Sequence, residues 1–259
     1  MSVTSIETLS RSRGLARIPA WLWVGAGACV LVLLQGTQML RDTDTFWQMK
    51  VGQWIIDHHA VPQVDVFSLT KAGAPWMSSS WLSQVLFAEV YAHAGWAGVV
   101  LLSALAIAVT FGLLVHLLER HIPSSYACFV AIVAFALAAH HFLARPHVLA
   151  MPVMVAWIGG LMAASDTRTR PSLWLLPLIA LWANLHGGFV LGLALIGPIA
   201  LDALWNAEPA QRKSVVVQWA LFGLAALAAA CLTPYGWNSI LAARKILDQI
   251  GRASCRERV

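Results

Sequence analysis

Seven long apolar runs dominate this sequence of 259 residues and limit what the chain can fold into. The first run, residues 18–40, contains no charged residue in 23 consecutive positions. A transmembrane helix needs about 20 largely apolar residues, because it crosses about 30 Å of hydrocarbon at 1.5 Å per residue. The sequence therefore predicts an all-α, polytopic bundle of about seven transmembrane helices. The other six runs are 96–118, 124–142, 148–164, 172–185, 189–205 and 214–232.

Composition narrows the class of protein further. Hydrophobic residues make up 59% of the chain and charged residues 11%, whereas a water-soluble domain usually carries about 25% charged residues. This balance excludes a soluble enzyme, a disordered tail protein and a fibrous protein. The net charge of +5 comes without a basic stripe or an RNA-binding motif, so we expect no nucleic-acid partner.

The basic residues predict which way the chain crosses the membrane. The first run is longer than the apolar core of a signal peptide, so we interpret it as an uncleaved anchor that follows a cytoplasmic segment, residues 1–17. With the N-terminus inside, eight Arg and Lys residues fall in cytoplasmic loops and four fall in outer loops before the last span. This distribution obeys the positive-inside rule.

The fifth run, residues 172–185, is short for a crossing. Pro177 and the pair Gly187-Gly188 interrupt its helical pattern. Broken helices are tolerated at membrane depth only where protein or a wet cavity covers the freed backbone. A single kinked or re-entrant element is therefore an alternative to a full span here.

The last ten residues, 250–259, break with the composition that precedes them. They contain three Arg, one Glu and one Cys. Their back-translation matches one reading frame of a common short-read sequencing adapter, so we interpret them as an artefact rather than as a basic cytoplasmic tail. We therefore expect the transmembrane domain, residues 18–249, to be truncated at its C-terminus.

A long outer loop, residues 41–95, follows the first span, and loops of this length are usually functional or structured. Its first part has apolar residues at helical spacing, which predicts an amphipathic helix in the membrane interface. A second amphipathic stretch, 81–91, begins after a candidate N-cap at Ser78-Ser79-Ser80 and leads into the second span. The apolar residues of the first stretch are Trp47, Val51, Trp54 and Ile55.

Short motifs are spread over residues 40–240, mostly in the predicted outer loops. They are Asp42-Thr43-Asp44-Thr45-Phe46-Trp47, Gly52-Gln53-Trp54-Ile55, Pro62, Asp65-Val66-Phe67-Ser68, Pro75-Trp76, Arg145-Pro146-His147, Trp182-Ala183-Asn184-Leu185-His186-Gly187-Gly188-Phe189 and Pro234-Tyr235-Gly236-Trp237. Together they resemble a group of bacterial polytopic membrane proteins related to the GT-C type glycosyltransferases, which use lipid-linked sugar donors. Two positions depart from that group: Gln48 stands in place of a histidine, and Ser79-Ser80 stands in place of a more polar or acidic pair.

The resemblance implies an acidic residue in the first outer loop that acts as catalytic base or contacts a divalent metal ion. It also implies a polyprenyl-phosphate carrier as the source of the sugar. Asp42 and Asp44 match the acidic position, and we favour Asp42 as the base, because a carboxylate there can deprotonate an acceptor hydroxyl as it attacks the anomeric carbon. The alternative is that Asp44 caps the interface helix while Asp42 faces headgroups or water.

Arg145 and His147 are candidate substrate contacts at the same face. The planar guanidinium of Arg145 can clamp a phosphate through paired hydrogen bonds, and interfacial snorkelling is the alternative. A metal site that joins His147 to His140 and His141 is disfavoured, because adjacent helical residues point about 100° apart.

Asn184 and His186 form an unusual polar cluster within an apolar stretch, beside Gly187-Gly188. The glycines would let a substrate or another backbone approach closely. We expect Asn184 and His186 to line a cavity at the outer face and to bind substrate. Helix packing through the small residues Gly188 and Gly192 is the alternative.

Two classes of function fit these observations. The first is a bacterial inner-membrane glycosyltransferase that moves a sugar from a polyprenyl-phosphate donor to an acceptor on the periplasmic face. The second is a non-enzymatic carrier, flippase or scaffold for envelope polysaccharide assembly. Carriers place ionisable groups near the bilayer midplane, whereas the polar residues of this chain cluster at one face. That asymmetry favours the enzyme.

Overall fold

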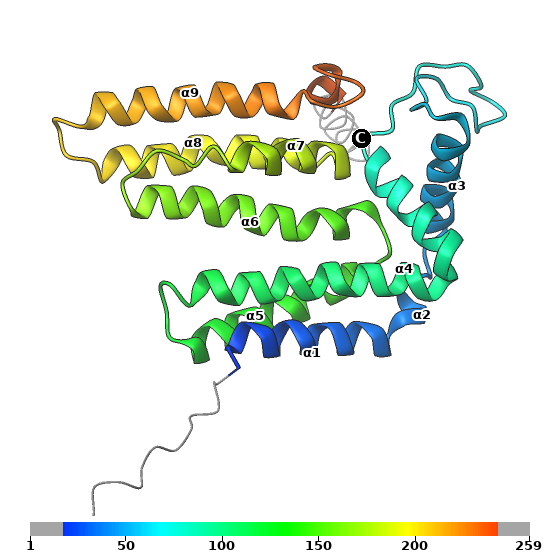
Figure 1. Cartoon of the computed structure of the whole chain (residues 1–259), viewed down its shortest axis with the longest axis horizontal. Coiled ribbons are helices and arrows are strands. Elements are labelled where there is room, and N and C mark those ends of the chain that lie inside the picture. Colours follow the sequence, from blue (N-terminus) through cyan, green and yellow to red (C-terminus); the bar gives the residue numbers. More distant parts are fainter. Residues whose placement is uncertain (1–17, 243–259) are drawn as a thin grey trace, which may run out of the picture.

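The computed structural model describes residues 18–242, and every regular element within that range is a helix (Figure 1). The all-α prediction is thereby confirmed. The predicted cytoplasmic segment, 1–17, and the adapter-like tail, 250–259, lie outside the described residues. The elements are α1 (Ala20–Leu34), α2 (Gly36–Met39), α3 (Thr43–His58), α4 (Trp81–Leu118), α5 (Ser124–Ala138), the 3-10 helix η1 (Ala139–His141), α6 (Pro146–Asp166), α7 (Leu175–Leu185), α8 (Phe189–Trp205) and α9 (Arg212–Ala230).

Four stretches are long and apolar enough to cross a membrane: α4, α6, α9 and the continuous stretch Ser124–His141 made by α5 and η1. Three further apolar helices, α1, α7 and α8, are shorter. The 11 residues of α7 reach about 17 Å at 1.5 Å per residue, well short of a bilayer core of about 30 Å. The fifth predicted run is thus the one that forms the shortest of these helices.

The first apolar run forms two helices rather than one. α1 ends at Leu34, the backbone of Gln35 leaves the helical region at φ −103° and ψ 17°, and α2 begins at Gly36. The amide of Gln35 still donates to the carbonyl of Val32 at 3.1 Å, so the chain bends while this hydrogen bond is kept. The predicted span 18–40 is therefore interrupted near its end.

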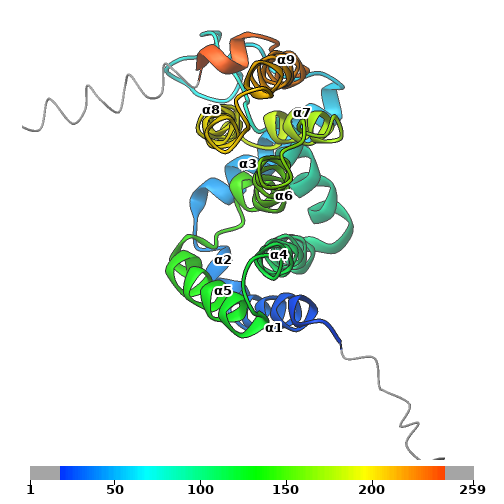
Figure 2. The ribbon, with the colours of Figure 1, turned by 90° about the vertical axis from the view of Figure 1, so that its left-hand side faces the viewer.

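The helices form two groups, which are seen end-on in Figure 2. α1, α4 and α5 surround one buried cluster that includes Ile107 and Phe111, whereas α6, α7, α8, α9 and part of α4 surround a second cluster that includes Trp157. α4 packs against α6 and so joins the two groups.

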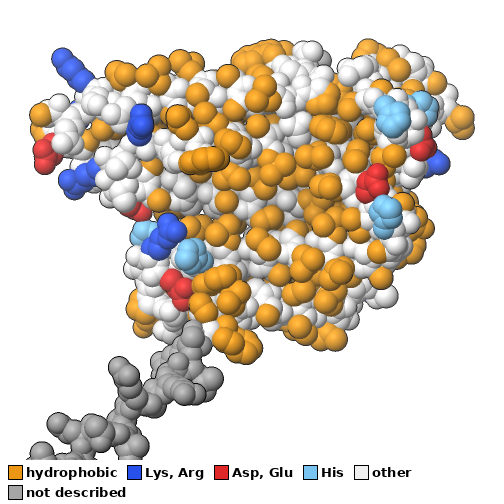
Figure 3. All heavy atoms as spheres, viewed as in Figure 1, with side chains coloured by type: hydrophobic (Ala, Val, Ile, Leu, Met, Phe, Trp, Pro, Cys, Tyr) orange, Lys and Arg blue, Asp and Glu red, His pale blue; other side chains and the backbone are white. Residues whose placement is uncertain are grey.

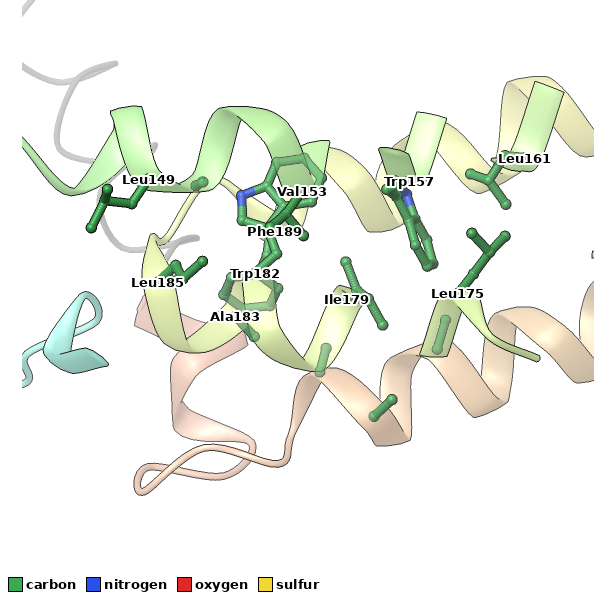
Figure 4. Packing of buried hydrophobic residues seen from close by; sticks show 14 of the residues in the cluster. Leu149, Val153, Trp157, Leu161, Leu175, Ile179, Trp182, Ala183, Leu185 and Phe189 are labelled. Atoms are coloured by element: carbon green, nitrogen blue, oxygen red, sulfur yellow. The ribbon is translucent and has the colours of Figure 1, made fainter. Parts of the chain in front are cut away.

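Close packing holds the second group together. Because lipid tails are as apolar as Leu, helices in a membrane associate chiefly through van der Waals contact and interhelical hydrogen bonds. Trp157 on α6 is fully buried, and its Nε1 donates to the carbonyl of Gly192 on α8 at 2.9 Å. A Cβ at Gly192 would lie 2.5 Å from the ring of Trp182, so a larger residue would separate these helices. Figure 4 shows the buried side chains of α6 and α7 facing one another, among them Leu149, Val153, Leu161, Leu175, Ile179 and Leu185.

The chain turns at two opposite ends of the bundle (Figure 1). One end carries α2, α3, the start of α4, the α5–α6 and α7–α8 connections and the segment after α9, and we call it the α3 end. The α4–α5, α6–α7 and α8–α9 connections lie at the other end. In the view of Figure 3, hydrophobic side chains cover the middle, and Lys and Arg gather mainly at the end opposite α3.

The segment 41–95 begins with α3, which covers the stretch that has apolar residues at helical spacing. α3 includes all four apolar residues of the pattern, and Val51 and Ile55 are buried against α4, but Trp47 is 38% exposed. Gly52 completes the buried face, because a Cβ there would lie 2.0 Å from the carbonyl oxygen of Gln84 on α4. The glycine permits the closest approach between α3 and α4.

α4 joins the second amphipathic stretch to the second span. The two halves meet at Gly95, whose φ of 58° and ψ of −154° interrupt the helical geometry, and α4 changes direction there (Figure 1). Only glycine adopts such a backbone readily. Ser80 takes the N-cap position of α4, but its side chain makes no capping hydrogen bond.

Candidate functional site

Asp42 lies where the chain enters α3. Its backbone is extended, at φ −90° and ψ 125°, and its Oδ1 accepts a hydrogen bond from the amide of Asp44 at 3.0 Å. Asp42 is therefore the N-cap of α3, which satisfies one of the free amides at the helix start. The alternative in which Asp44 caps the helix is wrong, because Asp44 lies in the first turn.

Arg145 bridges both aspartates. Its Nε donates to Oδ2 of Asp42, and its Nη2 lies 2.7 Å from Oδ2 of Asp44. The side chain of Asp42 is 12% exposed, whereas those of Arg145 and Asp44 are 37% and 56% exposed. We call these three residues the acid–arginine cluster.

Two backbone features bring Arg145 to this position. Arg145 is the residue before Pro146, which is the first residue of α6, and its extended backbone is the conformation that a following proline favours. The amide of Ala144 donates to the carbonyl of Met39 at 3.0 Å, which ties the α5–α6 connection to the end of α2. The cluster thus joins two segments that are far apart in the sequence.

The ion pairs fix the charge of the cluster. The hydrogen bond from Arg145 is the main cause that holds the pKa of Asp42 below its ordinary value, and the amide of Asp44 acts in the same direction. In turn, the Asp42 carboxylate raises the pKa of the Arg145 guanidinium. Both groups are therefore charged at neutral pH. Because two carboxylates surround one guanidinium, the cluster carries a net charge of −1.

His147 and His186 meet beside the cluster. Their ring centroids lie 6.3 Å apart in an edge arrangement, and Nε2 of His147 lies 3.0 Å from the carbonyl of His141. Nδ1 of His186 accepts from the amide of Gly188 at 3.0 Å, so its proton is on Nε2. Burial lowers the pKa of His186 to about 4. His186 is therefore a neutral imidazole near pH 7, with an N–H available as a hydrogen-bond donor.

Asn184 is occupied by contacts within the protein. Its Oδ1 accepts from Nε1 of Trp81 at 2.7 Å, and its Nδ2 donates to the carbonyls of Ala180 and Leu232 at 2.8 and 2.9 Å. These bonds tie the end of α7 to the start of α4 and to the segment after α9. Both amide hydrogens of Asn184 are used, so its contribution in this structure is to hold these elements together.

A buried polar network, which the sequence did not reveal, connects α3, α4, the segment between them and Tyr235. Gln84 on α4 donates to Oε1 of Gln48 on α3 at 2.6 Å, and its Oε1 accepts from the hydroxyl of Ser78. The amide of Ser78 donates to the hydroxyl of Tyr235, which itself donates to the carbonyl of Pro62, both at 2.8 Å. Gln48, one of the two departures from the resembling group, is thus a structural contact here. The signal in the sequence that could have indicated this network is a polar residue, Gln48, on the helix face that packs against α4.

The donor set at the acid–arginine cluster does not fit a metal ion. Both carboxylates already face the guanidinium of Arg145, and a cation would have to displace it. Within residues 18–242, no group of three or more His, Cys, Asp or Glu side chains is placed to hold a metal ion. The two aspartates that the resemblance offers as metal contacts therefore act as partners of an arginine in this structure.

Comparison with known proteins finds no matching family model, no matching curated protein and no matching solved structure.

Proposed function

We propose that this chain is the membrane-embedded part of a bacterial inner-membrane glycosyltransferase of GT-C type, which moves a sugar from a polyprenyl-phosphate donor to an acceptor at the outer face. The observation that supports this most directly is the acid–arginine cluster. It combines a carboxylate and a guanidinium, contributed by two distant segments, at one end of an apolar helix bundle. Surface chemistry on a lipid-borne substrate needs those two groups at such a place.

The proposal places seven segments across the membrane, with the N-terminus in the cytoplasm. They are α1 with α2, α4, α5 with η1, α6, α7 with the non-helical connection that leads into it, α8 and α9. The α3 end then faces the periplasm, and α3 and the first half of α4 lie along the interface. The positive-inside rule supports this orientation, because the loops at the opposite end carry an excess of basic residues. They are Arg120, Arg168, Arg170, Arg212 and Lys213.

Arg145 and Asp42 exchange partners in the proposed reaction. A carboxylate whose pKa is depressed by a guanidinium is a weak base. When the phosphate of the donor lipid reaches Arg145, it competes with Asp42 for the same guanidinium, because arginine binds phosphate and carboxylate with the same paired geometry. The pKa of Asp42 then rises toward its ordinary value, and its carboxylate becomes a better proton acceptor.

The transfer step follows from this exchange. The Asp42 carboxylate takes the proton of the acceptor hydroxyl, the acceptor oxygen forms a bond to the anomeric carbon, and the bond from that carbon to the phosphate oxygen breaks. The departing phosphate keeps the electron pair and is stabilised by Arg145. Asp44 remains ion-paired with Arg145, and the neutral His186 donates its Nε2–H to a sugar hydroxyl. His147, whose Nε2–H is donated to the carbonyl of His141, accepts a hydrogen bond from a sugar hydroxyl through Nδ1.

The experiment is donor turnover by the full chain reconstituted in vesicles of bacterial lipid. Each member of a panel of polyprenyl-phosphate sugars is supplied with a membrane lipid extract as acceptor source, and release of polyprenyl phosphate is measured. We expect the double variant Asp42→Asn, Asp44→Asn to abolish release and Asp57→Asn, an exposed carboxylate on the same helix, to leave it unchanged. Turnover that survives in the double variant would contradict the assignment.

The non-enzymatic alternative makes a different prediction in the same vesicles. A carrier or scaffold would release no polyprenyl phosphate from any donor. It would instead move the intact lipid-linked sugar across the bilayer or retain it. Absence of turnover combined with transbilayer movement of the donor therefore favours a carrier.

A further inference from the structure

A cavity lies at the α3 end, on the side of the bundle away from α7. It has a volume of about 470 Å³ and lies between the α1–α2 bend and the junction of α5 with η1. Both walls change helix geometry where they line the cavity: Gln35 interrupts the first wall, and the 3-10 turn Ala139–His141 ends the second. Its volume is within the range typical of ligand sites, about 300–1,000 Å³.

The lining is graded along the helix axes. Val32 and Phe135 line the part toward the middle of the bundle, whereas Gln38, Arg41 and His140 line the part toward the α3 end. Arg41 follows Val32 by nine residues and lies beyond both the bend at Gln35 and the end of α2. The cavity is therefore lined by apolar side chains toward the middle of the bundle and by hydrogen-bond donors toward the α3 end. A membrane lipid has the same arrangement, with an apolar chain and a polar headgroup.

The polar part of the cavity is suited to an anion. Its polar side chains are arginine, histidine and glutamine, and no carboxylate lines it. Within the described part of the chain no carboxylate forms an ion pair with Arg41, whereas nearby Arg145 is engaged by two aspartates. A guanidinium without a carboxylate partner, beside an amide and an imidazole, matches the oxygens of a phosphate.

The cavity opens toward the surface that lipid would cover. Leu31 lines it and is 50% exposed, and Leu34 and Leu137 on its two flanking helices are 78% and 76% exposed. Large apolar side chains exposed on both edges make lateral entry from a bilayer the natural route. An occupant with an acyl or prenyl chain would cover these side chains, which a free phosphate ion would not.

We propose that this cavity binds the phosphate headgroup of a membrane lipid, with Arg41 and His140 holding the phosphate and the lipid chain lying along Leu31 and Phe135. The inference rests on the membrane placement proposed above, but not on sugar transfer. The site is separate from the acid–arginine cluster, although Arg41 directly precedes Asp42 and the carbonyl of Leu143 accepts a hydrogen bond from the amide of Arg145. A lipid phosphate held here would lie next to that cluster.

The test is photolabelling of the full chain in phosphatidylcholine nanodiscs that contain a trace of phosphatidic acid with a diazirine in its chain. We expect crosslinks concentrated in residues 31–41 and 135–143. The double variant Arg41→Gln, His140→Gln should weaken this labelling roughly tenfold or more at sub-saturating probe, because it removes charge-assisted hydrogen bonds. Lys50→Gln, an exposed cation on α3 that does not line the cavity, is the matched control and should label like the unaltered chain.

A second variant tests the cavity without changing charge. Ala139→Trp fills the space from the η1 wall, and we expect it to reduce labelling as strongly as the double variant. A diazirine diacylglycerol, which has no phosphate, should label the exposed apolar helices evenly without preference for the two segments. If that neutral probe labels none of the apolar helices, the membrane placement itself is wrong.

The remaining outcomes separate the sources of phosphate. If millimolar inorganic phosphate abolishes the phosphatidic acid crosslinks, the site binds a free anion and the lipid assignment is overturned. Labelling that is spread evenly over the helices, or that is unchanged in both variants, also overturns it. Preferential labelling that resists free phosphate and is lost in both variants supports it, whatever the outcome of the sugar-transfer assay.

Discussion

Arg145 Nη2 lies 2.7 Å from Oδ2 of Asp44, while Nε of the same guanidinium donates to Asp42. One arginine is thus paired with two aspartates at the start of α3, the N-cap Asp42 and Asp44 in the first turn. The arrangement has two consequences that can be measured separately, since Asp42 also caps the helix through its Oδ1.

Asp42→Asn and Asp42→Ala should differ in stability. Asparagine is as good an N-cap as aspartate, so Asp42→Asn removes the charge and keeps the cap, whereas Asp42→Ala removes both. We expect the alanine variant to be less stable than the asparagine variant by about 0.5–2 kcal/mol. Thermal unfolding in detergent, followed by helical circular dichroism, measures the difference. Equal midpoints for the two variants would show that the cap contributes nothing.

The contribution of the Asp42 charge should depend on pH. The pKa of Asp42 is lowered in the folded protein, so its stabilisation is fully present above its unfolded value, near pH 4, and is lost as the pH falls through the folded pKa. The unaltered chain should therefore unfold at a higher temperature than Asp42→Asn at pH 7, and the two should converge under strongly acidic conditions. A gap that widens toward low pH would contradict the ion pair.

His186 should stay neutral throughout the physiological range. Burial lowers its pKa to about 4, so the unfolded chain binds a proton more readily than the folded one between about pH 6.5 and pH 4. Stability linked to His186 is complete above that window and is lost as the pH falls through it. Nitrogen-15 NMR of labelled histidines should report an Nε2–H tautomer for His186 and a midpoint near 4. A midpoint near 6.5 for His186 would exclude the burial effect.

Gly52→Ala should weaken the contact between α3 and α4. The added Cβ would lie 2.0 Å from the carbonyl oxygen of Gln84, and overpacking of this kind typically costs about 1–3 kcal/mol. Gly27→Ala in α1 is the control, because nothing lies within 4 Å of its added Cβ. Faster protease cleavage of residues 59–80 in Gly52→Ala alone is the expected result. Equal cleavage in both variants would show that α3 tolerates the displacement.

Tyr235→Phe should destabilise the segment between α3 and α4. The hydroxyl both accepts from the amide of Ser78 and donates to the carbonyl of Pro62, so its removal leaves two buried backbone groups unpaired, at a cost of about 1–3 kcal/mol. Tyr126→Phe, at a side chain that is 65% exposed, should change little. The free energy of unfolding of each variant, measured in a mild detergent and compared with that of the unaltered chain, tests both expectations. If Tyr126→Phe costs as much, the network has no special role.

The helices of this protein could be predicted from the sequence because the long apolar runs correspond to helices. α8 begins and ends where the run 189–205 does, and α5 begins at Ser124 as its run predicts. The bend at Gln35 could not be predicted from charge, because the residues at which it occurs, Gln35-Gly36-Thr37-Gln38, are polar or small but uncharged. At the bend, a Cβ on Gly36 would lie 3.0 Å from the side chain of Val100 on α4, a tertiary contact that the local pattern does not contain.

The candidate site could be predicted only in part. The sequence identified Asp42, Asp44 and Arg145 as unusual charges, but their pairing depends on the hydrogen bond between Ala144 and Met39, a tertiary contact without a local signature. It placed Asn184 in a substrate cavity, yet Trp81 and Leu232 occupy its amide. The sequence shows which polar and charged residues lie where burial is costly. Which partner forms a hydrogen bond or ion pair with each of them depends on the fold.

The hydrogen bond from Tyr235 to Pro62 also determines when the segment between α3 and α4 can be completed during protein synthesis. Pro62 leaves the ribosome 173 residues before its partner, which at about 5–20 residues per second is roughly 9–35 s. The segment between α3 and α4 is made early but gains this hydrogen bond only after α9 has been made. Until then, the polar network beside the acid–arginine cluster lacks Tyr235, so a nascent chain cannot complete it before that residue has been synthesised.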